Sequence, residues 1–164
     1  MMTATLAQEI TLTRLFNAPR ELVWKAWTDP YHLQRWWGPH GFVNTDCAIE
    51  MRVGGVMRLN MHAPDGNVYP CKGTFREIVA PERLVYDGDP EDAHACGAGL
   101  PPRATVTLTL TERGEQTLLT LHTRFASAER LQAAADAGFV IGWETTLERL
   151  ADYFITYNHP GDTR

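Results

Sequence analysis

The sequence predicts an α+β fold in which an antiparallel sheet packs against one long C-terminal helix. Six large apolar residues near the C-terminus are spaced by three or four positions, which places them on one stripe of a helix. They are Phe139, Trp143, Leu147, Leu150, Phe154 and Tyr157. Between about residues 43 and 125 the chain is instead typical of short strands separated by tight turns. Strands followed by one segregated helix indicate an α+β domain with an antiparallel sheet.

The N-terminal part predicts one strand followed by two short helices. Residues 10–16 alternate between polar and apolar side chains, which indicates a strand. Pro19 is expected at the start of the first helix, because proline is favoured at a first helical position. Asp29 is expected to end that helix and to cap a second one, which runs to Trp36.

Turns rich in glycine and proline divide the central part of the chain into six strands. The glycines at 54–55 and the turn at 64–67 predict reversals, because glycine accepts positive φ and proline presets its own φ. The expected strands are residues 43–53, 56–62, 68–79, 83–87, 104–112 and 116–125. We also expect a bulge near Gly73, an N-cap at Ser127, and a break at Gly138 that divides the last helical region in two.

Composition indicates one domain and argues against nucleic-acid binding. The chain has 164 residues, and we expect a tail at 1–8, a single domain at 9–157 and a second tail at 158–164. The formal net charge is −5, whereas binding to a phosphate backbone requires a basic face. No apolar run reaches the roughly 20 residues of a membrane span.

The N-terminus and the cysteines predict a cytoplasmic protein. The first residues lack a basic stretch followed by an apolar core, so we expect no secretory signal. The three cysteines, Cys47, Cys71 and Cys96, are odd in number and widely spaced, which is typical of free thiols in a reducing compartment.

Seven short segments, taken in order, carry a family resemblance. They are 14–19 (RLFNAP), 23–30 (VWKAWTDP), 36–39 (WWGP), 54–55 (GG), 65–66 (DG), 73–84 (GTFREIVAPERL) and 142–143 (GW). Over about residues 9–156 the chain resembles the activator of heat shock protein 90 ATPase homologue family. This family lies within the START-like, birch-pollen-allergen-like (SRPBCC) superfamily of helix-grip folds.

The resemblance implies a fold but not one chemistry. It implies a seven-stranded antiparallel sheet wrapped around the C-terminal helix, two short helices after the first strand, and a cavity between sheet and helix. The wider superfamily includes lipid carriers, hormone receptors, polyketide cyclases and co-chaperone domains, so function has to be argued from the site.

Large side chains expected to face this cavity are the candidate ligand-binding residues. They are Trp37, Phe42, Met57, Leu59, Met61, Tyr69, Phe75, Tyr86, Trp143 and Leu147. The methionine row is placed inside because the alternate residues of that strand include Arg58, which prefers water. An apolar wall with few polar groups predicts non-catalytic binding of a small apolar, aromatic or lipid-like molecule, and plain core packing is the alternative.

The residues at 88–102 form the longest connection, and long loops in compact domains are often functional. We expect this loop to be a mobile border of the cavity mouth. A connection without a role is the alternative.

Catalysis, metal binding and partner binding have weaker signals. The sequence has no nucleophile elbow, zinc-protease motif or phosphate loop. A cyclase- or hydrolase-like enzyme stays an alternative, with His40, His94 and Glu77 as its candidate acid–base groups. Glu144 and Glu148 lie four residues apart, and we interpret them as part of a solvated helix face that continues to Arg149 and Asp152. A role as acids in the pocket is the alternative.

We expect no cofactor and no metal, because His94 and Cys96 provide two ligands where a site needs at least three. An edge strand or the helix pair is able to support a homodimer. A co-chaperone that stimulates a chaperone ATPase is the least favoured alternative, because one domain offers no obvious means of gripping a large partner.

Overall fold

The computed structural model describes residues 8–89, 101 and 103–157. Seven antiparallel strands form one sheet in the order β1-β7-β6-β5-β4-β3-β2. The strands are β1 (Glu9–Phe16), β2 (Val43–Ile49), β3 (Val56–His62), β4 (Val68–Val79), β5 (Arg83–Gly88), β6 (Thr105–Arg113) and β7 (Gln116–Arg124). The helices are α1 (Arg20–Thr28), α2 (Pro30–Trp36), α3 (Ala128–Asp136) and α4 (Phe139–Tyr157).

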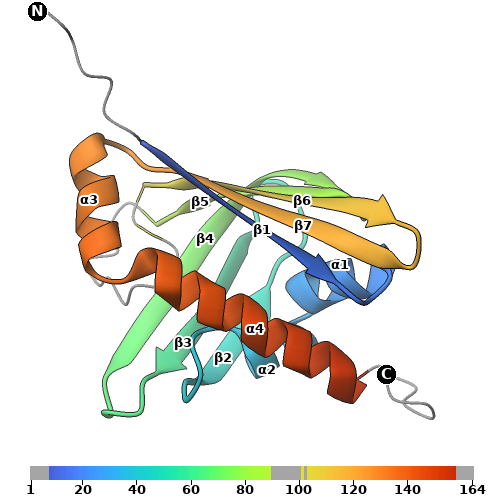
Figure 1. Cartoon of the computed structure of the whole chain (residues 1–164). Coiled ribbons are helices and arrows are strands. Elements are labelled where there is room, and N and C mark those ends of the chain that lie inside the picture. Colours follow the sequence, from blue (N-terminus) through green and yellow to red (C-terminus); the bar gives the residue numbers. More distant parts are fainter. Residues whose placement is uncertain (1–7, 90–100, 102, 158–164) are drawn as a thin grey trace, which may run out of the picture.

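The sheet curves around α4, as Figure 1 shows, while α1 and α2 connect its two edge strands, β1 and β2. This arrangement confirms the α+β class and the helix-grip fold, with two short helices after the first strand. The edge strand β1 lies next to the last strand because it pairs with β7 along its whole length, from Glu9–Arg124 to Phe16–Thr117.

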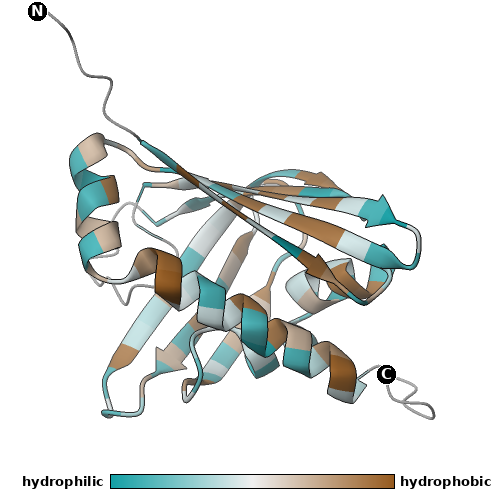
Figure 2. Ribbon diagram, in the orientation of Figure 1, coloured by the Kyte–Doolittle hydropathy of each residue, from teal (hydrophilic) through white to brown (hydrophobic). Residues whose placement is uncertain are grey.

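One face of the sheet is apolar and turns toward α4. On β3, Met57, Leu59 and Met61 are buried, whereas Arg58 between them is exposed. The same alternation runs along β6 and β7, and Figure 2 shows it as brown residues interrupted by paler or teal ones. An antiparallel sheet with one solvated face requires this period of two.

Helix α4 covers the apolar face with its predicted stripe. Five of the six stripe residues are buried, with exposed fractions of 0–3%. They are Phe139, Trp143, Leu147, Leu150 and Phe154. Tyr157, at the end of the stripe, is half-buried and stacks on Tyr153. Burying one such side chain contributes about 1.5–3 kcal/mol, so this stripe is a principal attachment of α4.

Three predicted helix boundaries are confirmed. The Asp29 carboxylate accepts a hydrogen bond from the Tyr31 amide at 2.9 Å, which caps α2. The Ser127 hydroxyl accepts one from the Arg130 amide at 3.1 Å, which caps α3. Gly138 has φ +90°, a conformation that favours glycine, and it separates α3 from α4.

Two local predictions are wrong. The strand predicted at 43–53 ends at Ile49, because a tight turn follows it. The turn is so close that a Cβ at Gly55 would lie 2.2 Å from the Glu50 carbonyl oxygen. The bulge in β4 lies between Phe75 and Glu77 rather than near Gly73. The extra residue allows Phe75 and Ile78, three positions apart, to pack on the same core.

The predicted loop at 88–102 lies mostly outside the described residues, as do His94 and Cys96.

Candidate functional site

The structure places most of the ten candidate ligand-binding residues in the core between the sheet and α4. Eight are buried. They are Trp37, Met57, Leu59, Met61, Phe75, Tyr86, Trp143 and Leu147. The other two, Phe42 and Tyr69, are half-buried and pack against that core, with their ring centroids 6.5 Å apart. Trp37, Met61 and Tyr86 have exposed fractions of 0%, so neighbouring protein atoms enclose them fully.

Four tryptophans join three helices behind this wall. Trp27 of α1 stacks on Trp143 of α4, with ring centroids 5.9 Å apart and an interplanar angle of 7°. Trp37 meets Trp143 edge to face at 5.2 Å, and Trp36 donates from its indole N–H to the Ala26 carbonyl at 3.0 Å. The cluster ties the α2–β2 connection to α4, so Trp37 belongs to the interior rather than to an open mouth.

Three buried polar atoms in this region have no hydrogen-bond partner in the part of the chain that the structure describes. They are the Tyr86 hydroxyl and the indole nitrogens of Trp27 and Trp37. Burial raises the pKa of the Tyr86 hydroxyl well above its usual value, and the nearby Cys71 thiol raises it further. By contrast, the buried Thr146 hydroxyl is satisfied, because it donates to the Gly142 carbonyl at 2.7 Å.

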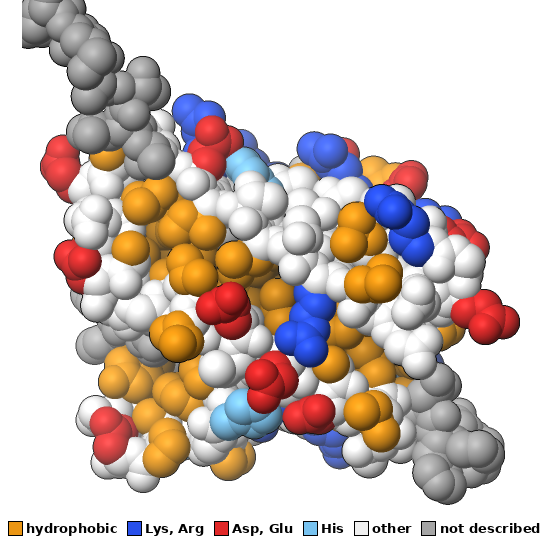
Figure 3. Space-filling model, viewed as in Figure 1, with side chains coloured by type: hydrophobic (Ala, Val, Ile, Leu, Met, Phe, Trp, Pro, Cys, Tyr) orange, Lys and Arg blue, Asp and Glu red, His pale blue; other side chains and the backbone are white. Residues whose placement is uncertain are grey.

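A groove of about 350 Å³ opens between β1 and α4. Its lining residues are Leu12, Thr13, Arg14, Glu144, Leu147 and Glu148. Figure 3 shows this face, where apolar side chains lie beside basic and acidic ones. Leu147 belongs both to the groove and to the buried stripe, so the groove borders the interior wall directly.

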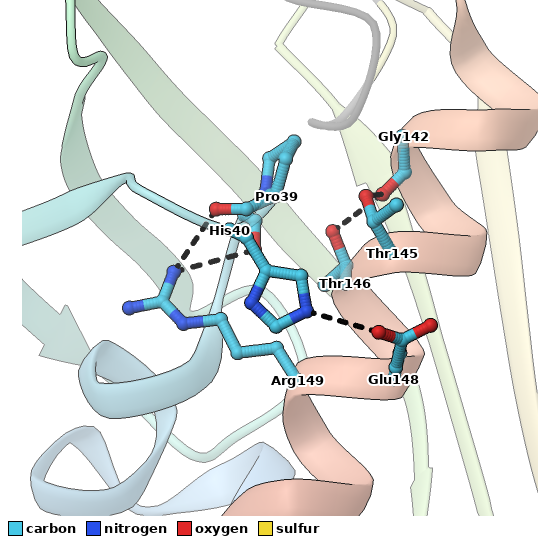
Figure 4. Close-up of polar contacts among 8 residues, drawn as sticks. Pro39, His40, Gly142, Thr145, Thr146, Glu148 and Arg149 are labelled. Carbon is cyan, nitrogen blue, oxygen red and sulfur yellow. Dashed lines mark hydrogen bonds and ion pairs between the residues drawn. The ribbon is translucent and has the colours of Figure 1, made fainter.

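Two side chains of α4, Arg149 and Glu148, hold the segment after α2 (Figure 4). The Arg149 guanidinium donates to the carbonyl oxygens of Trp37, Gly38 and Pro39 at 3.1, 3.3 and 3.3 Å. The His40 imidazole lies 3.3 Å from the Glu148 carboxylate. Arg149 is half-buried, and burial lowers its pKa from the usual value. The interpretation of a solvated face therefore holds for the exposed Glu144, Glu148 and Asp152 but is wrong for Arg149.

The candidate acid–base residues do not meet in the interior. His40 is half-exposed at its contact with Glu148, and Glu77 is exposed and pairs with Arg83 at 3.1 Å. Among the described residues the buried histidine is His32, which the sequence analysis did not single out. Its Nδ1 lies 2.5 Å from the Tyr153 hydroxyl, and its ring also contacts those of Tyr31 and Tyr157.

The groove was also missed from the sequence, although β1 carries a signal for it. Arg14 occupies the same strand face as Leu12 and Phe16, where an apolar residue would continue the alternation. A charged residue in such a row marks a position where the strand face approaches solvent. That Glu144 of α4 lines the same groove as Arg14 follows only once the position of α4 is known.

Comparison with known proteins decides the family. The family model for Activator of Hsp90 ATPase homolog 1-like protein matches residues 17–154. The chain belongs to this family. The fold of this family supports a ligand-binding domain. The match does not identify the ligand.

Solved structures agree over almost the whole length. Protein NE0264 from Nitrosomonas europaea is 25% identical, with a TM-score of 0.80 over 92% of this chain and 96% of that one. Protein Ms6760 from Mycobacterium smegmatis is 27% identical, with a TM-score of 0.78 over 93% of each chain. A protein from Arthrobacter aurescens is 30% identical, with a TM-score of 0.77 over 88% and 84%. No curated protein matches the sequence.

The described residues provide neither a membrane-spanning helix nor a cluster of metal ligands. None of the helices in these segments is long and apolar enough to cross a membrane. Within the same segments, no three His, Cys, Asp or Glu side chains gather in a way that could hold a metal ion.

Proposed function

We propose that the protein binds a small, largely apolar or aromatic molecule between the concave face of the sheet and α4, without catalysing a reaction. The observation that carries this proposal is the Tyr86 hydroxyl, which is buried among apolar side chains and has no partner among the described residues. An unpaired buried hydroxyl costs about 1–3 kcal/mol, and a ligand with a hydrogen-bond acceptor would remove that cost.

The wall around Tyr86 suits a ligand with an apolar body. Phe75 meets the Tyr86 ring edge to face at 6.2 Å, and the row of Met57, Leu59 and Met61 lies on the same sheet face. Each 100 Å² or so of apolar surface that leaves water contributes about 2.5 kcal/mol. A ligand has to displace these enclosed side chains, and methionines adapt readily because they are unbranched and have three rotatable bonds.

The test compares ligands of one shape with and without an acceptor. We would screen 2-acetylnaphthalene and 2-isopropylnaphthalene, with further aromatic and lipid-like compounds, by thermal shift and calorimetry. In a Tyr86→Phe variant, the ketone is expected to bind about fivefold to tenfold more weakly, whereas the hydrocarbon keeps its affinity. Tyr31→Phe, which alters a tyrosine of α2, is the matched control.

Two results would contradict the proposal. One is a screen in which no compound raises the melting temperature. The other is an affinity that stays unchanged in a Leu59→Phe variant. The larger side chain would occupy part of the interior space and should weaken the binding of a ligand there.

No observation on the described residues favours the two alternative functions, a cyclase- or hydrolase-like enzyme and a co-chaperone. The acid–base candidates His40 and Glu77 lie at the surface, away from the interior wall on which the proposed ligand would pack. The family's name refers to activation of the Hsp90 ATPase, and a pull-down with the chaperone followed by an ATPase assay would test that role separately.

A further inference from the structure

We propose that the groove between β1 and α4 binds the charged end of a zwitterionic ligand, with its anionic group at Arg14 and its ammonium at Glu144. This inference deepens the proposed function, because Leu147 lines both the groove and the interior wall. The shared chemistry is an ammonium and an anion a few ångströms apart on an apolar body, as in an apolar amino acid.

The basic wall of the groove is a guanidinium that no described carboxylate neutralises. Arg14 is half-buried on β1, and its guanidinium carbon lies 5.8 Å from the centre of the Phe16 ring. None of the ion pairs among the described residues includes Arg14. A guanidinium placed in this way suits a carboxylate or phosphate, because its planar fork of donors matches two oxygens at once.

The acidic wall is formed by α4. Glu144 and Glu148 are one helical turn apart and both line the groove. Glu148 is paired with His40 at 3.3 Å, whereas Glu144 makes no ion pair with a described residue. One unpaired carboxylate therefore faces the groove from α4, opposite the unpaired guanidinium of β1.

The two opposite charges line the same space without bridging it, and that selects the kind of ligand. A simple anion would meet attraction from Arg14 but repulsion from Glu144, and a simple cation would meet the reverse. A zwitterion in the complementary orientation is attracted at both ends, so the groove discriminates against singly charged relatives. Leu12 and Leu147 provide apolar contacts for the rest of the molecule.

The size of the groove agrees with one small molecule. Ligand sites in proteins commonly enclose about 300–1,000 Å³. The volume of about 350 Å³ lies at the lower end of that range, which suits an amino acid or the headgroup of one lipid.

The experiment uses four probes and measures affinity by calorimetry. They are phenylalanine, phenylalaninamide without the carboxylate, N-acetylphenylalanine without the ammonium, and dihexanoyl phosphatidylcholine as a lipid zwitterion. A zwitterion is expected to bind about tenfold more tightly than either singly charged relative. Arg14→Gln should abolish the preference for phenylalanine over its amide, and Glu144→Gln should abolish the preference over the N-acetyl compound.

Matched controls separate the groove from the general charge of the protein. Arg58→Gln alters an exposed arginine on β3, and Asp152→Asn alters an exposed carboxylate on α4 outside the groove. Both variants should keep the preferences of the wild type. Binding by phosphatidylcholine but not phenylalanine, with the same dependence on Arg14 and Glu144, would support the zwitterion and identify a lipid headgroup as its source.

Three results would overturn the inference: singly charged probes that bind as well as the zwitterions, preferences that survive both substitutions, or no binding by any of the four probes. The proposed function fails or stands independently, because binding of the naphthalene pair depends on Tyr86 and not on Arg14 or Glu144. If naphthalene binding does not depend on Tyr86, the proposed function is wrong. If zwitterion binding does not depend on Arg14 and Glu144, the groove proposal is wrong.

Discussion

Cys47 on β2 is a thiol whose environment suppresses ionisation. Burial, and secondarily the carboxylate of Asp29, raise its pKa to about 11. Because the pKa is raised in the folded state, this group favours folding below its usual pKa of 9.0, and that contribution is lost as pH rises toward about 11. Only the thiolate is nucleophilic, so the folded protein should protect Cys47 from alkylation.

We predict that Cys47 in the folded protein reacts with iodoacetamide at pH 8 about 100-fold more slowly than in urea, since about 0.1% of a thiol with that pKa is ionised. Peptide mass spectrometry measures the rate at this cysteine separately from the others. Asp29→Asn keeps an N-cap side chain but removes the charge, so it should accelerate alkylation. Equal rates in folded and unfolded protein would show that the pKa is not raised.

At the scale of single elements, α4 and the segment that follows α2 act as one unit. Arg149 provides a half-buried guanidinium for three consecutive carbonyl groups, which would otherwise lack that donor. Asn44 of β2 holds the same turn from the other side, because its side-chain amide donates to the carbonyls of Gln34 and Trp37 at 2.9 and 2.8 Å. Phe42 and His40 are positioned by this fastening.

We predict that Arg149→Met lowers the free energy of unfolding by about 2 kcal/mol and increases amide exchange at residues 37–42. Urea denaturation and hydrogen exchange measure the two effects. Arg130→Gln changes an exposed arginine of α3 and should alter stability by less than about 0.5 kcal/mol. If both variants lose the same stability, the contacts of Arg149 with the carbonyls contribute nothing specific.

At the scale of the whole molecule, the sheet and α4 form one cooperative unit. The α4 stripe packs into the same core as both halves of the sheet, and the tryptophan cluster links that core to α1 and α2. Damage to the stripe should therefore unfold the sheet as well as the helix.

We predict that Leu150→Asp unfolds the protein, because the side chain is 0% exposed and the new carboxylate would be buried without a partner. Ile155→Asp, on the same helix at a position 77% exposed, should keep the native circular dichroism. A soluble Leu150→Asp protein with an unchanged spectrum would mean that α4 is not needed to hold the sheet.

The sequence by itself determined the elements whose signals are local. The 3.6-residue period of the α4 stripe, the alternation around Met57 and Met61, and the caps at Asp29 and Ser127 depend only on backbone geometry over a few residues. These features predicted the α+β class with an antiparallel sheet, and the family resemblance implied the helix-grip fold. Even at this scale the bulge predicted near Gly73 lies between Phe75 and Glu77 instead, because its position depends on how β4 pairs with β5.

The tertiary structure alone decided the groove, the Arg149 contacts and the isolation of the Tyr86 hydroxyl. Arg14 meets the α4 wall only after β1 has paired with β7, whose residues lie about a hundred positions further along the chain. Whether a charge in a strand is paired, exposed or opposite another charge follows from that long-range pairing. A pattern of neighbouring residues cannot predict the partners of such a charge, because the groups that interact with it come from a distant element.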